Sequence, residues 1–501
     1  MNKPLQMPMF KPETEWVPPV SLPDLKEYKE IAIDLETRDP NLMTMGSGSV
    51  RGDGEVIGIA VAVEGWSGYF PINHEGGGNM DRALTLDWFE EVLHTPATKI
   101  FHNAMYDVSW IRSLGFQING GIVDTLIAAS LINENRWGYS LNALGKEYVG
   151  MGKNEKILNE AAKDWGVDPK SEMWRLPAPL VGEYAEQDAI VTLKLWHALQ
   201  HEISKQDLWD VFNMETNLFP CLVDMKFKGV RVDINKAEAL KKQLTVTEKD
   251  MHRDIKKLAG FDVEIWAAAS IAKAFDKEKI PYDRTEKGAP SFTKNFLATH
   301  PAELPKLINE AREINKANTT FIETILKHEH NGRIHADINQ IRSDQGGTVT
   351  GRFSYSNPNL QQIPARHKEL GPLIRSLFIP EKDTKWGCFD YSQQEPRLVV
   401  HFASLLKLEG TSTIVDAYKE GSADFHQMIA DMAGIERKQA KTINLGIMYG
   451  MGKNKLMAEL GLLKDAAEKL LKTYNQKAPF VRMLSDAVSR RADDSGKIRT
   501  I

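Results

Sequence analysis

Two acidic side chains, Asp34 and Glu36, stand two residues apart at the end of an apolar stretch in "IAIDLETRDP" (residues 31–40). The alternating apolar residues around them are typical of a buried β-strand, and residues two apart on a strand point to the same side of the sheet. Two carboxylates placed in this way repel each other unless a cation lies between them. The spacing therefore predicts a cation-binding site at the end of this strand.

Two further pairs of polar residues follow in the same part of the chain, each with a spacing of four. Asn103 and Asp107 follow the apolar strand "KIF", and Tyr184 and Asp188 share one face of a helical pattern. Taken singly, an aspartate near a strand end is more often a cap or turn residue, and a Tyr–Asp pair is an ordinary helix-surface pair. The occurrence of all three motifs within one α/β region favours a catalytic set.

The motif order Asp-x-Glu, Asn-x-x-x-Asp and Tyr-x-x-x-Asp resembles that of the DEDD 3′–5′ exonucleases, in the subclass with the tyrosine. The chemistry of that family uses two divalent cations about 4 Å apart, which activate a water molecule and stabilise the leaving oxygen of a phosphodiester. Carboxylates suit such cations, and the resemblance implies two Mg²⁺ or Mn²⁺ ions per active site. It assigns Asp34, Glu36, Asp107 and Asp188 as metal ligands, Tyr184 as the residue that orients the water, and Asp124 in "GIVDTLIAASL" as a supporting residue.

A second group of residues with possible chemistry lies in the C-terminal half. The stretch "WGCFDYSQQEPRLVVHFASLL" has the pattern of an apolar strand that ends at Asp390 and is followed by a helix, where Pro396 suits the first turn. Further along, "ERKQAKTINLGIMYGMG" places Arg437, Lys441 and Leu445 four residues apart along one helix. On its own, this helix is equally well interpreted as a surface helix with two cations.

Together with "GGTVTGRFSYSNPNLQQIPAR" (346–366), these stretches resemble family A DNA polymerases, the group of bacterial DNA polymerase I and many phage replicases. The resemblance implies a template-directed DNA polymerase, a nucleotidyltransferase that takes primer–template DNA and dNTPs and uses two Mg²⁺ or Mn²⁺ ions. By this resemblance Asp390 binds both metals, and the Tyr391 carbonyl binds one of them. Glu395, held by Tyr449, is the steric gate against a ribose 2′-hydroxyl, and the triphosphate is neutralised by His426, Arg437 and Lys441. Arg352 reads the primer-end minor groove, and Thr350 and Gln362 contact DNA.

Three departures from the polymerase pattern matter. Gln394 and Pro396 replace the aliphatic residues that the family usually has after the motif's aspartate, a change that resembles the phage enzymes and is expected to be harmless. Leu445 stands where the family usually has Phe or Tyr, and an aliphatic side chain there is expected to weaken stacking on the nucleotide and to alter rate and sugar discrimination. The family's motif C, a His-Asp-Glu turn with a second metal-binding aspartate, would follow "GKIRTI", and the sequence ends at Ile501. We therefore expect a C-terminally incomplete polymerase, either truncated or split with a second chain that carries motif C. Exonuclease is then the activity expected of this chain in isolation.

The elements that must position these residues fall into two regions. After an extended, proline-rich lead-in (1–25), residues 26–205 alternate strand-like and helical stretches, which predicts an α/β exonuclease domain with an RNase H-like mixed sheet. Long amphipathic helical patterns follow, of which two are expected to end at Gly229 and Gly260. With the resemblance, they predict a largely helical right-hand polymerase domain over 206–501: thumb 206–335, partial palm 336–400 and fingers 401–501.

Composition excludes several other classes of protein. No apolar run approaches the roughly 20 residues of a membrane span. The N-terminus lacks the basic and then apolar order of residues that is typical of a signal peptide. The two cysteines, Cys221 and Cys388, lie far apart and suggest no disulfide framework. A cytoplasmic protein of a bacterial or phage-infected cell is therefore predicted. The net charge of −5 hides a basic segment, since residues 434–501 carry 14 Lys and Arg against 7 Asp and Glu. That segment is either a solvated helical face or a phosphate-binding surface.

Two alternatives to a proofreading polymerase stay open. One is a stand-alone 3′–5′ exonuclease whose second half only grips primer–template, and the other is a non-catalytic DNA-binding half of a split polymerase. The presence of His426, Arg437 and Lys441 favours the polymerase. Intact acids at positions 34, 36, 107 and 188 argue against a non-catalytic subunit.

Overall fold

The computed structural model describes residues 14–365, 367–496 and 498 of the 501-residue chain. The chain divides into two compact units, one up to Lys385 and one from Trp386 onward. The first 13 residues of the predicted lead-in lie outside the described residues, and residues 14–25 form no helix or strand. None of the described helices is both long and apolar enough to cross a membrane.

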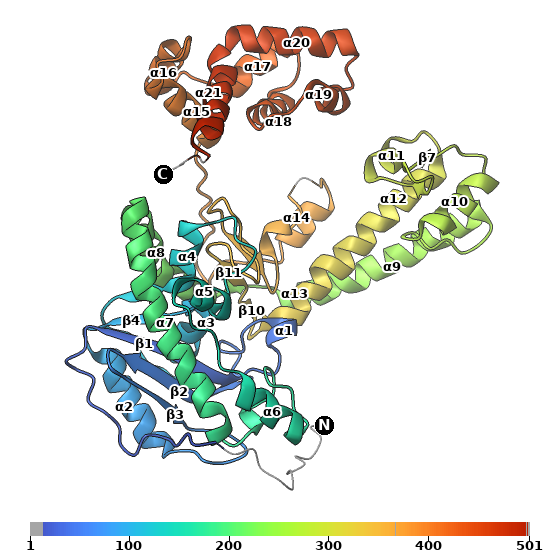
Figure 1. Ribbon diagram of the computed structural model, residues 1–501. Helices are drawn as coiled ribbons and strands as arrows, with labels where there is room; N and C mark the ends of the chain where they lie inside the picture. Colours follow the sequence, from blue (N-terminus) through green and yellow to red (C-terminus); the bar gives the residue numbers. More distant parts are fainter. Residues whose placement is uncertain (1–13, 366, 497, 499–501) are drawn as a thin grey trace. The chain divides into compact units, whose positions relative to one another are not determined.

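A five-stranded mixed sheet forms the N-terminal part of the first unit, in the order β3-β2-β1-β4-β5 (Figure 1). Its strands are β1 (Glu30–Arg38), β2 (Glu55–Val63), β3 (Trp66–Pro71), β4 (Thr98–Phe101) and β5 (Ile122–Asp124). The strands β1, β2 and β3 pair antiparallel, whereas β1, β4 and β5 pair parallel. The sequence-based prediction of an α/β domain with a mixed sheet is confirmed.

Apolar side chains cover both faces of this sheet, and their alternation along β1 decides where its acids point. Ile31, Ile33 and Leu35 pack into the layer that contains α2 (Arg82–His94) and α3 (Ala104–Ser113). Ala32 packs into the opposite layer, which contains the long helix α7 (Pro179–Gln206). Because strand side chains alternate, Asp34 and Glu36 share the α7 face with Ala32.

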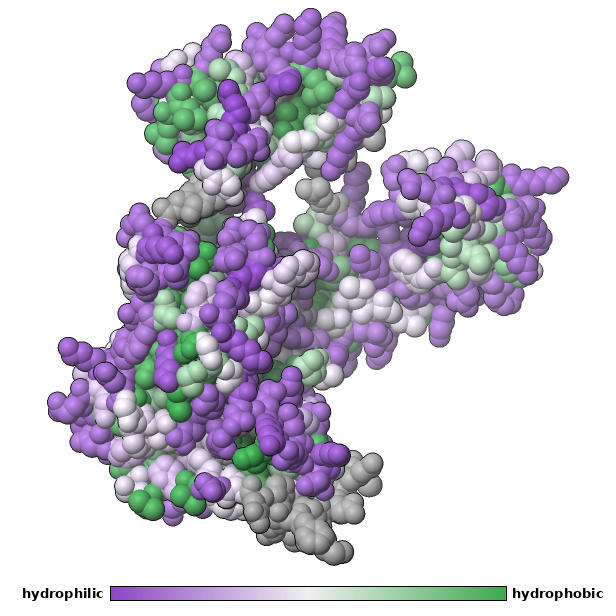
Figure 2. Space-filling view, viewed as in Figure 1, coloured by the Kyte–Doolittle hydropathy of each residue, from purple (hydrophilic) through white to green (hydrophobic). Residues whose placement is uncertain are grey.

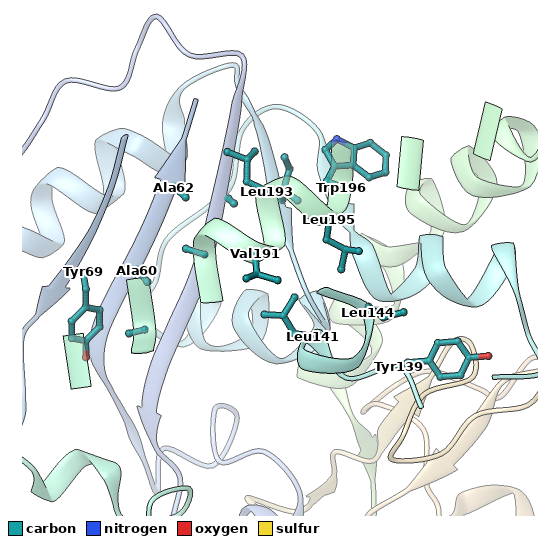
Figure 3. Packing of buried hydrophobic residues seen from close by; sticks show 14 of the residues in the cluster. Ala60, Ala62, Tyr69, Tyr139, Leu141, Leu144, Val191, Leu193, Leu195 and Trp196 are labelled. Carbon is teal, nitrogen blue, oxygen red and sulfur yellow. The ribbon is translucent and has the colours of Figure 1, made fainter. Parts of the chain in front are cut away.

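Three further helices contact α7 in this layer. They are α4 (Thr125–Ile132), α5 (Leu141–Tyr148) and α6 (Lys156–Trp165). Figure 3 shows Val191 of α7 close to Leu141 of α5 in this packed layer. The helix α7 is therefore fixed against both the sheet and α5, which sets the position of any polar side chain that it carries.

The rest of the first unit is mainly helical. The helices are α8 (Trp209–Lys228), α9 (Ile234–Ala259), α10 (Ala268–Lys277), α11 (Lys294–Thr299), α12 (Glu303–Lys316), a π-helical turn (Ala317–Ile322), α13 (Glu323–His328) and α14 (Leu370–Arg375). The helices α8 and α9 end at Gly229 and at Gly260, as predicted, and Gly260 takes the left-handed conformation (φ 74°) that favours glycine. Figure 1 shows α9 and α12 side by side as a long hairpin.

Short elements complete this unit. They are α1 (Leu42–Met45), the 3₁₀ turns Met173–Arg175 and Leu360–Gln362, and the strands β6 (Val230–Arg231), β7 (Asp283–Arg284), β8 (Pro290–Ser291), β9 (Glu329–His330), β10 (Arg333–Ile334), β11 (Asp337–Asn339) and β12 (Ser354–Ser356). The strands β11 and β12 pair antiparallel, and the loop between them carries part of the predicted polymerase motif.

The second unit is built of helices: α15 (Gln394–Leu405), α16 (Thr411–Lys419), α17 (Phe425–Ala433), α18 (Arg437–Met448), α19 (Lys453–Leu460), α20 (Lys464–Lys477) and α21 (Pro479–Ser495). Its core includes Val400, Phe425, Ile429 and Phe480. Pro396 lies in the first turn of α15, as predicted. On the face shown in Figure 2, hydrophilic side chains cover most of α20, whose Lys464, Lys469 and Lys472 are exposed.

The predicted strand that ends at Asp390 is wrong. Residues 385–391 form neither helix nor strand, and Phe389 and Tyr391 are 97% and 82% exposed. A strand needs a partner to satisfy its backbone hydrogen bonds, and within the described part of the chain no strand pairs with this segment. The apolar composition of the segment thus does not produce a strand here.

Candidate active sites

Four acidic side chains and a tyrosine from three elements gather on the α7 face of the sheet. Asp34 and Glu36 come from β1, Asp107 from the first turn of α3, and Tyr184 and Asp188 from successive turns of α7. The Asp107 Oδ1 atom accepts a hydrogen bond of 2.9 Å from the backbone N–H of Leu35, which fixes α3 to the strand between the two β1 acids. The structure therefore brings together all five residues that the exonuclease resemblance selected.

The acids are buried without enough partners to neutralise them. Glu36, Asp107 and Asp188 are 7%, 4% and 2% exposed. Burial and then the charge of Asp188 raise the pKa of the Asp34 carboxyl to about 7. Burial is also the main cause that raises the pKa values of Glu36, Asp107 and Asp188 above their ordinary values. At Glu36 and Asp107, repulsion from the charge of Asp34 is the second largest cause. The group thus stores unfavourable electrostatic energy that a bound cation would relieve.

A lysine that the sequence-based prediction missed lies among these acids. The Lys153 ammonium group forms an ion pair with Asp188 Oδ2. It also donates a hydrogen bond of 2.9 Å to the Tyr184 hydroxyl and lies 4.9 Å from the centre of the Tyr184 ring. Burial, and next the charge of Asp188, raise the pKa of Tyr184 well above its ordinary value, so its hydroxyl stays protonated at neutral pH.

Asp124, the predicted supporting residue, holds the start of α3. Its two carboxylate oxygens accept hydrogen bonds of 2.9 Å from the backbone N–H groups of Asn103 and Ala104, and one of 2.8 Å from that of Leu126. Asn103 is in the left-handed region (φ 67°), which asparagine adopts more readily than most residues other than glycine. Asp124 therefore fixes the turn from which α3 projects Asp107.

Three predicted DNA-contacting residues lie in the first unit, in and after the loop between β11 and β12. Thr350 and Arg352 are exposed in this loop, which is braced by a hydrogen bond of 2.7 Å from Thr348 Oγ1 to the Arg352 carbonyl oxygen. Gln362 is exposed at the end of the 3₁₀ turn Leu360–Gln362. These positions leave the side chains accessible to a large ligand such as DNA.

The remaining predicted polymerase residues lie in the second unit. Asp390 and Tyr391 are exposed in the irregular segment before α15, and Glu395 lies in the first turn of α15. Gln393, the residue that precedes α15, accepts hydrogen bonds at Oε1 from the backbone N–H of Phe425 (3.0 Å) and from the Tyr418 hydroxyl (3.2 Å). This glutamine joins the start of α15 to the start of α17.

His426 is buried at the start of α17 beside Asn444, a partner that the sequence-based prediction did not include. Its Nδ1 atom lies 3.2 Å from Asn444 Nδ2, and Asn444 Oδ1 in turn accepts a hydrogen bond of 2.9 Å from the Tyr474 hydroxyl. Burial, and then the charge of Arg437, lower the pKa of His426. The imidazole is therefore predominantly neutral at neutral pH in the absence of an anionic ligand.

The helix α18 begins at Arg437 because Glu436 and Gln439 form a capping box at its N-terminus. Arg437 Nε and Nη2 donate hydrogen bonds of 2.7 and 3.2 Å to the Asp424 carboxylate, which also caps α17. Lys441 lies exposed one turn further along, Leu445 is half-buried, and Tyr449 is 69% exposed where the helix ends. The two predicted triphosphate cations thus differ, since Arg437 is paired with an acid and Lys441 faces solvent.

Comparison with known protein families decides between the alternatives. Residues 21–204 match the model of a 3′-5′ exonuclease family, and residues 234–501 match the model of DNA polymerase family A. The chain belongs to DNA polymerase family A. It is a family A DNA-directed DNA polymerase with a 3′–5′ exonuclease domain, as predicted, and neither alternative is favoured over this function.

The similar proteins include phage and bacterial polymerases. A DNA-directed DNA polymerase of Pseudomonas phage M6 is 35% identical over 99% of this chain and 84% of its own length. The DNA polymerase DpoZ of Acinetobacter phage SH-Ab 15497 is 30% identical over 96% of this chain and 82% of its own length. DNA polymerase I of Pseudomonas aeruginosa is 28% identical over 96% of this chain and 52% of its own length. The phage-like character predicted from the motifs agrees with these relatives.

The fold agrees with that of a solved family A polymerase. The structure described as the POL domain of Pol1 from M. smegmatis, in complex with DNA primer-template and dNTP, matches with a TM-score of 0.72 at 20% identity and covers 95% of this chain and 77% of that chain. Together with the two matched family models, this agreement confirms the predicted order of an exonuclease domain followed by a polymerase domain.

Exonuclease and polymerase domains of family A generally depend on divalent cations. Among the described residues no three His, Cys, Asp or Glu side chains converge closely enough to hold a metal ion, and the Lys153 ammonium group lies beside Asp188 instead. The donor set nevertheless fits divalent cations. Glu36 Oε1 and Asp188 Oδ1 are buried and accept no hydrogen bond within the described part of the chain, and hard cations prefer such carboxylate oxygens.

The sequence-based prediction missed several polar residues near the two sites, among them Lys153, Asp424 and Asn444. Asp424 had a usable signal, because an aspartate just before a helical pattern is typical of an N-cap. Lys153 lies in an irregular segment between α5 and α6, and Asn444 lies within a helix. Neither position follows a spacing rule, so both contacts are visible only in the folded polymerase.

Proposed function

We propose that Asp34, Glu36, Asp107, Tyr184 and Asp188 form the 3′–5′ exonuclease site of this polymerase and remove nucleotides from the 3′ end of a DNA strand. The observation that carries the proposal is the pair of buried carboxylate oxygens, Glu36 Oε1 and Asp188 Oδ1, that no other group in the described residues satisfies. Buried charges persist in proteins when they are paired or bind metals.

Two Mg²⁺ or Mn²⁺ ions would be held by Asp34, Glu36, Asp107 and Asp188. When bound, such ions activate a water molecule and offset charge on the leaving oxygen of the phosphodiester. The chain's own residues prepare this site in two ways. The Leu35 N–H fixes Asp107 relative to the β1 acids, and Tyr184, one turn before Asp188 on α7, presents a protonated hydroxyl that can orient a water molecule by hydrogen bonding.

We further propose that the polymerase site takes primer–template DNA and a dNTP, with two Mg²⁺ or Mn²⁺ ions bound through Asp390 and the Tyr391 carbonyl. Support comes from the matched family model and from the names of the phage relatives. In this proposal the triphosphate is bound by His426, Arg437 and Lys441. The nucleotide sugar and base are contacted by Glu395, Leu445 and Tyr449. The DNA is contacted by Thr350, Arg352 and Gln362. Since Arg437 already pairs with Asp424, Lys441 is the cation that meets an incoming phosphate at least cost.

The division into an exonuclease domain (26–205), thumb (206–335), palm (336–400) and fingers (401–501) is part of the same proposal. A second chain that supplies motif C stays a prediction from the sequence. The phage and bacterial sources of the relatives support action in the cytoplasm of a bacterial or phage-infected cell.

The exonuclease proposal is tested with the double variant Asp34→Ala/Glu36→Ala. It should abolish Mg²⁺-dependent shortening of 3′-end-labelled single-stranded DNA, while the thermal midpoint in EDTA should not fall, because two repelling acids have been removed. The matched control is Asp87→Ala/Glu91→Ala, which removes two exposed acids from α2 of the same domain. Degradation at the wild-type rate by the double variant would refute the assignment.

A further inference from the structure

The position of Lys153 is set by the elements around the exonuclease site. Its backbone N–H donates a hydrogen bond of 3.0 Å to Asn142 Oδ1 on α5. The Gln187 side-chain amide on α7 donates one of 3.4 Å to the carbonyl oxygen of the preceding Gly152. The segment is thus tied to both helices that border the site. The Lys153 side chain is 20% exposed, so the ammonium group is turned inward and away from bulk solvent.

The ammonium group contacts two of the five proposed exonuclease residues at once. It pairs with Asp188 Oδ2 and donates a hydrogen bond to the Tyr184 hydroxyl, while Asp188 Oδ1 stays buried without a partner. Its charge also acts on Asp34 and Glu36 and offsets part of their mutual repulsion. A divalent cation bound to Asp188 would meet this positive charge at close range, and like charges in a buried site repel strongly.

We propose that Lys153 is a positioning residue that serves as an internal counter-ion and competes with the divalent cation for Asp188. The inference rests on the proposed exonuclease function. In the metal-free site the ammonium group holds Asp188 and occupies the Tyr184 hydroxyl. When a cation binds Asp188, the ammonium group moves away and the Tyr184 hydroxyl becomes available to water or substrate. Through Lys153, the binding of a metal ion to Asp188 thereby releases the Tyr184 hydroxyl, which orients the water.

The test is Mn²⁺ binding to the full chain without DNA, measured by electron paramagnetic resonance, so that activity is not the readout. Asp188→Asn defines which bound ions belong to this site. Lys153→Met should bind Mn²⁺ there about tenfold more tightly, because the loss of one charge-assisted bond removes a competitor. Lys156→Met removes an exposed cation three residues away and should leave the affinity unchanged.

A second measurement separates an internal counter-ion from a general charge effect. In EDTA, Lys153→Met should have a lower thermal midpoint than wild type, and saturating Mn²⁺ should close this gap. If Lys153→Met does not fold, Lys153→Gln, which keeps an amide donor without the charge, takes its place. Equal or weaker Mn²⁺ binding by the lysine variant would overturn the inference and leave the exonuclease site intact. Wild-type Mn²⁺ binding by Asp188→Asn would instead overturn the exonuclease assignment, and the inference with it.

Discussion

The carboxylate of Asp107 accepts a hydrogen bond of 2.9 Å from the backbone N–H of Leu35, the residue that separates Asp34 from Glu36. This bond joins the first turn of α3 to the backbone of β1 between its two acids. Asp107 thus has two roles that a substitution can separate, because the acceptor oxygen positions the helix and the negative charge serves the proposed metal site.

Asp107→Asn and Asp107→Ala should differ in stability although both lose the charge. The asparagine keeps an oxygen that can accept the Leu35 N–H, whereas alanine leaves this buried donor unpaired, which costs about 1–3 kcal/mol. Urea unfolding in EDTA should therefore rank Asp107→Ala below Asp107→Asn, and neither variant should degrade DNA. Equal unfolding free energies would show that the bond adds nothing to stability.

The stability of the metal-free protein should fall as the pH rises through the acidic and neutral range. The folded-state pKa of Asp34 is raised to about 7 from 3.8, so the folded protein binds more protons than the unfolded chain between these values. Its contribution to stability is present below the unfolded pKa and is lost as the pH approaches about 7. Thermal unfolding in EDTA from pH 4 to pH 8 should show a shallower decline for Asp34→Asn. An unchanged pH dependence in this variant would contradict the raised pKa.

Asp124→Ala should destabilise the protein although Asp124 is not among the proposed metal ligands. It removes acceptors from the three backbone donors of Asn103, Ala104 and Leu126, at an expected cost of about 2–4 kcal/mol in the free energy of unfolding. Asp81→Ala is the matched control, because Asp81 caps α2 through one exposed bond to Leu84 N and should cost about 1 kcal/mol. Similar losses measured by urea unfolding would contradict the positioning role of Asp124.

Lys441→Ala should weaken dNTP binding to the primer–template complex. The loss of one charge-assisted bond to a triphosphate oxygen corresponds to about 1.5–3 kcal/mol, or roughly 10- to 150-fold in affinity. Lys455→Ala, which removes an exposed cation from the next helix, is the control and should bind dNTP as the wild type does. If Lys441→Ala bound dNTP with unchanged affinity, α18 would be interpreted as an ordinary surface helix.

The convergence of the proposed exonuclease residues could be predicted from the sequence because regular elements place them. The two-residue period of β1 sets Asp34 and Glu36 on one face, and the four-residue spacing on α7 does the same for Tyr184 and Asp188. Lys153 could not be predicted, since it reaches Asp188 from an irregular segment 35 residues earlier in the chain. Contacts of this kind depend on tertiary packing, which no local pattern reports.

Two features of the polymerase half also depend on tertiary packing and could not be predicted from local sequence patterns. The stripe of Arg437, Lys441 and Leu445 follows from helix geometry, but the ion pair between Arg437 and Asp424 depends on how α17 meets α18. The strand expected before Asp390 has suitable side chains, yet strand formation is decided by pairing with another strand rather than by composition. The motifs therefore indicated which helices carry the proposed polymerase residues but not which residues these pair with.

The double pairing of β1, antiparallel with β2 and parallel with β4, also limits how this enzyme can evolve. A one-residue insertion before Asp34 would turn every following side chain of the strand over. Asp34 and Glu36 would then enter the layer of Phe89 and Phe101, and Leu35 would leave it. Such a chain would fail to fold rather than fold without activity. Length changes should therefore be tolerated after Arg38, where the strand ends, and eliminated within it.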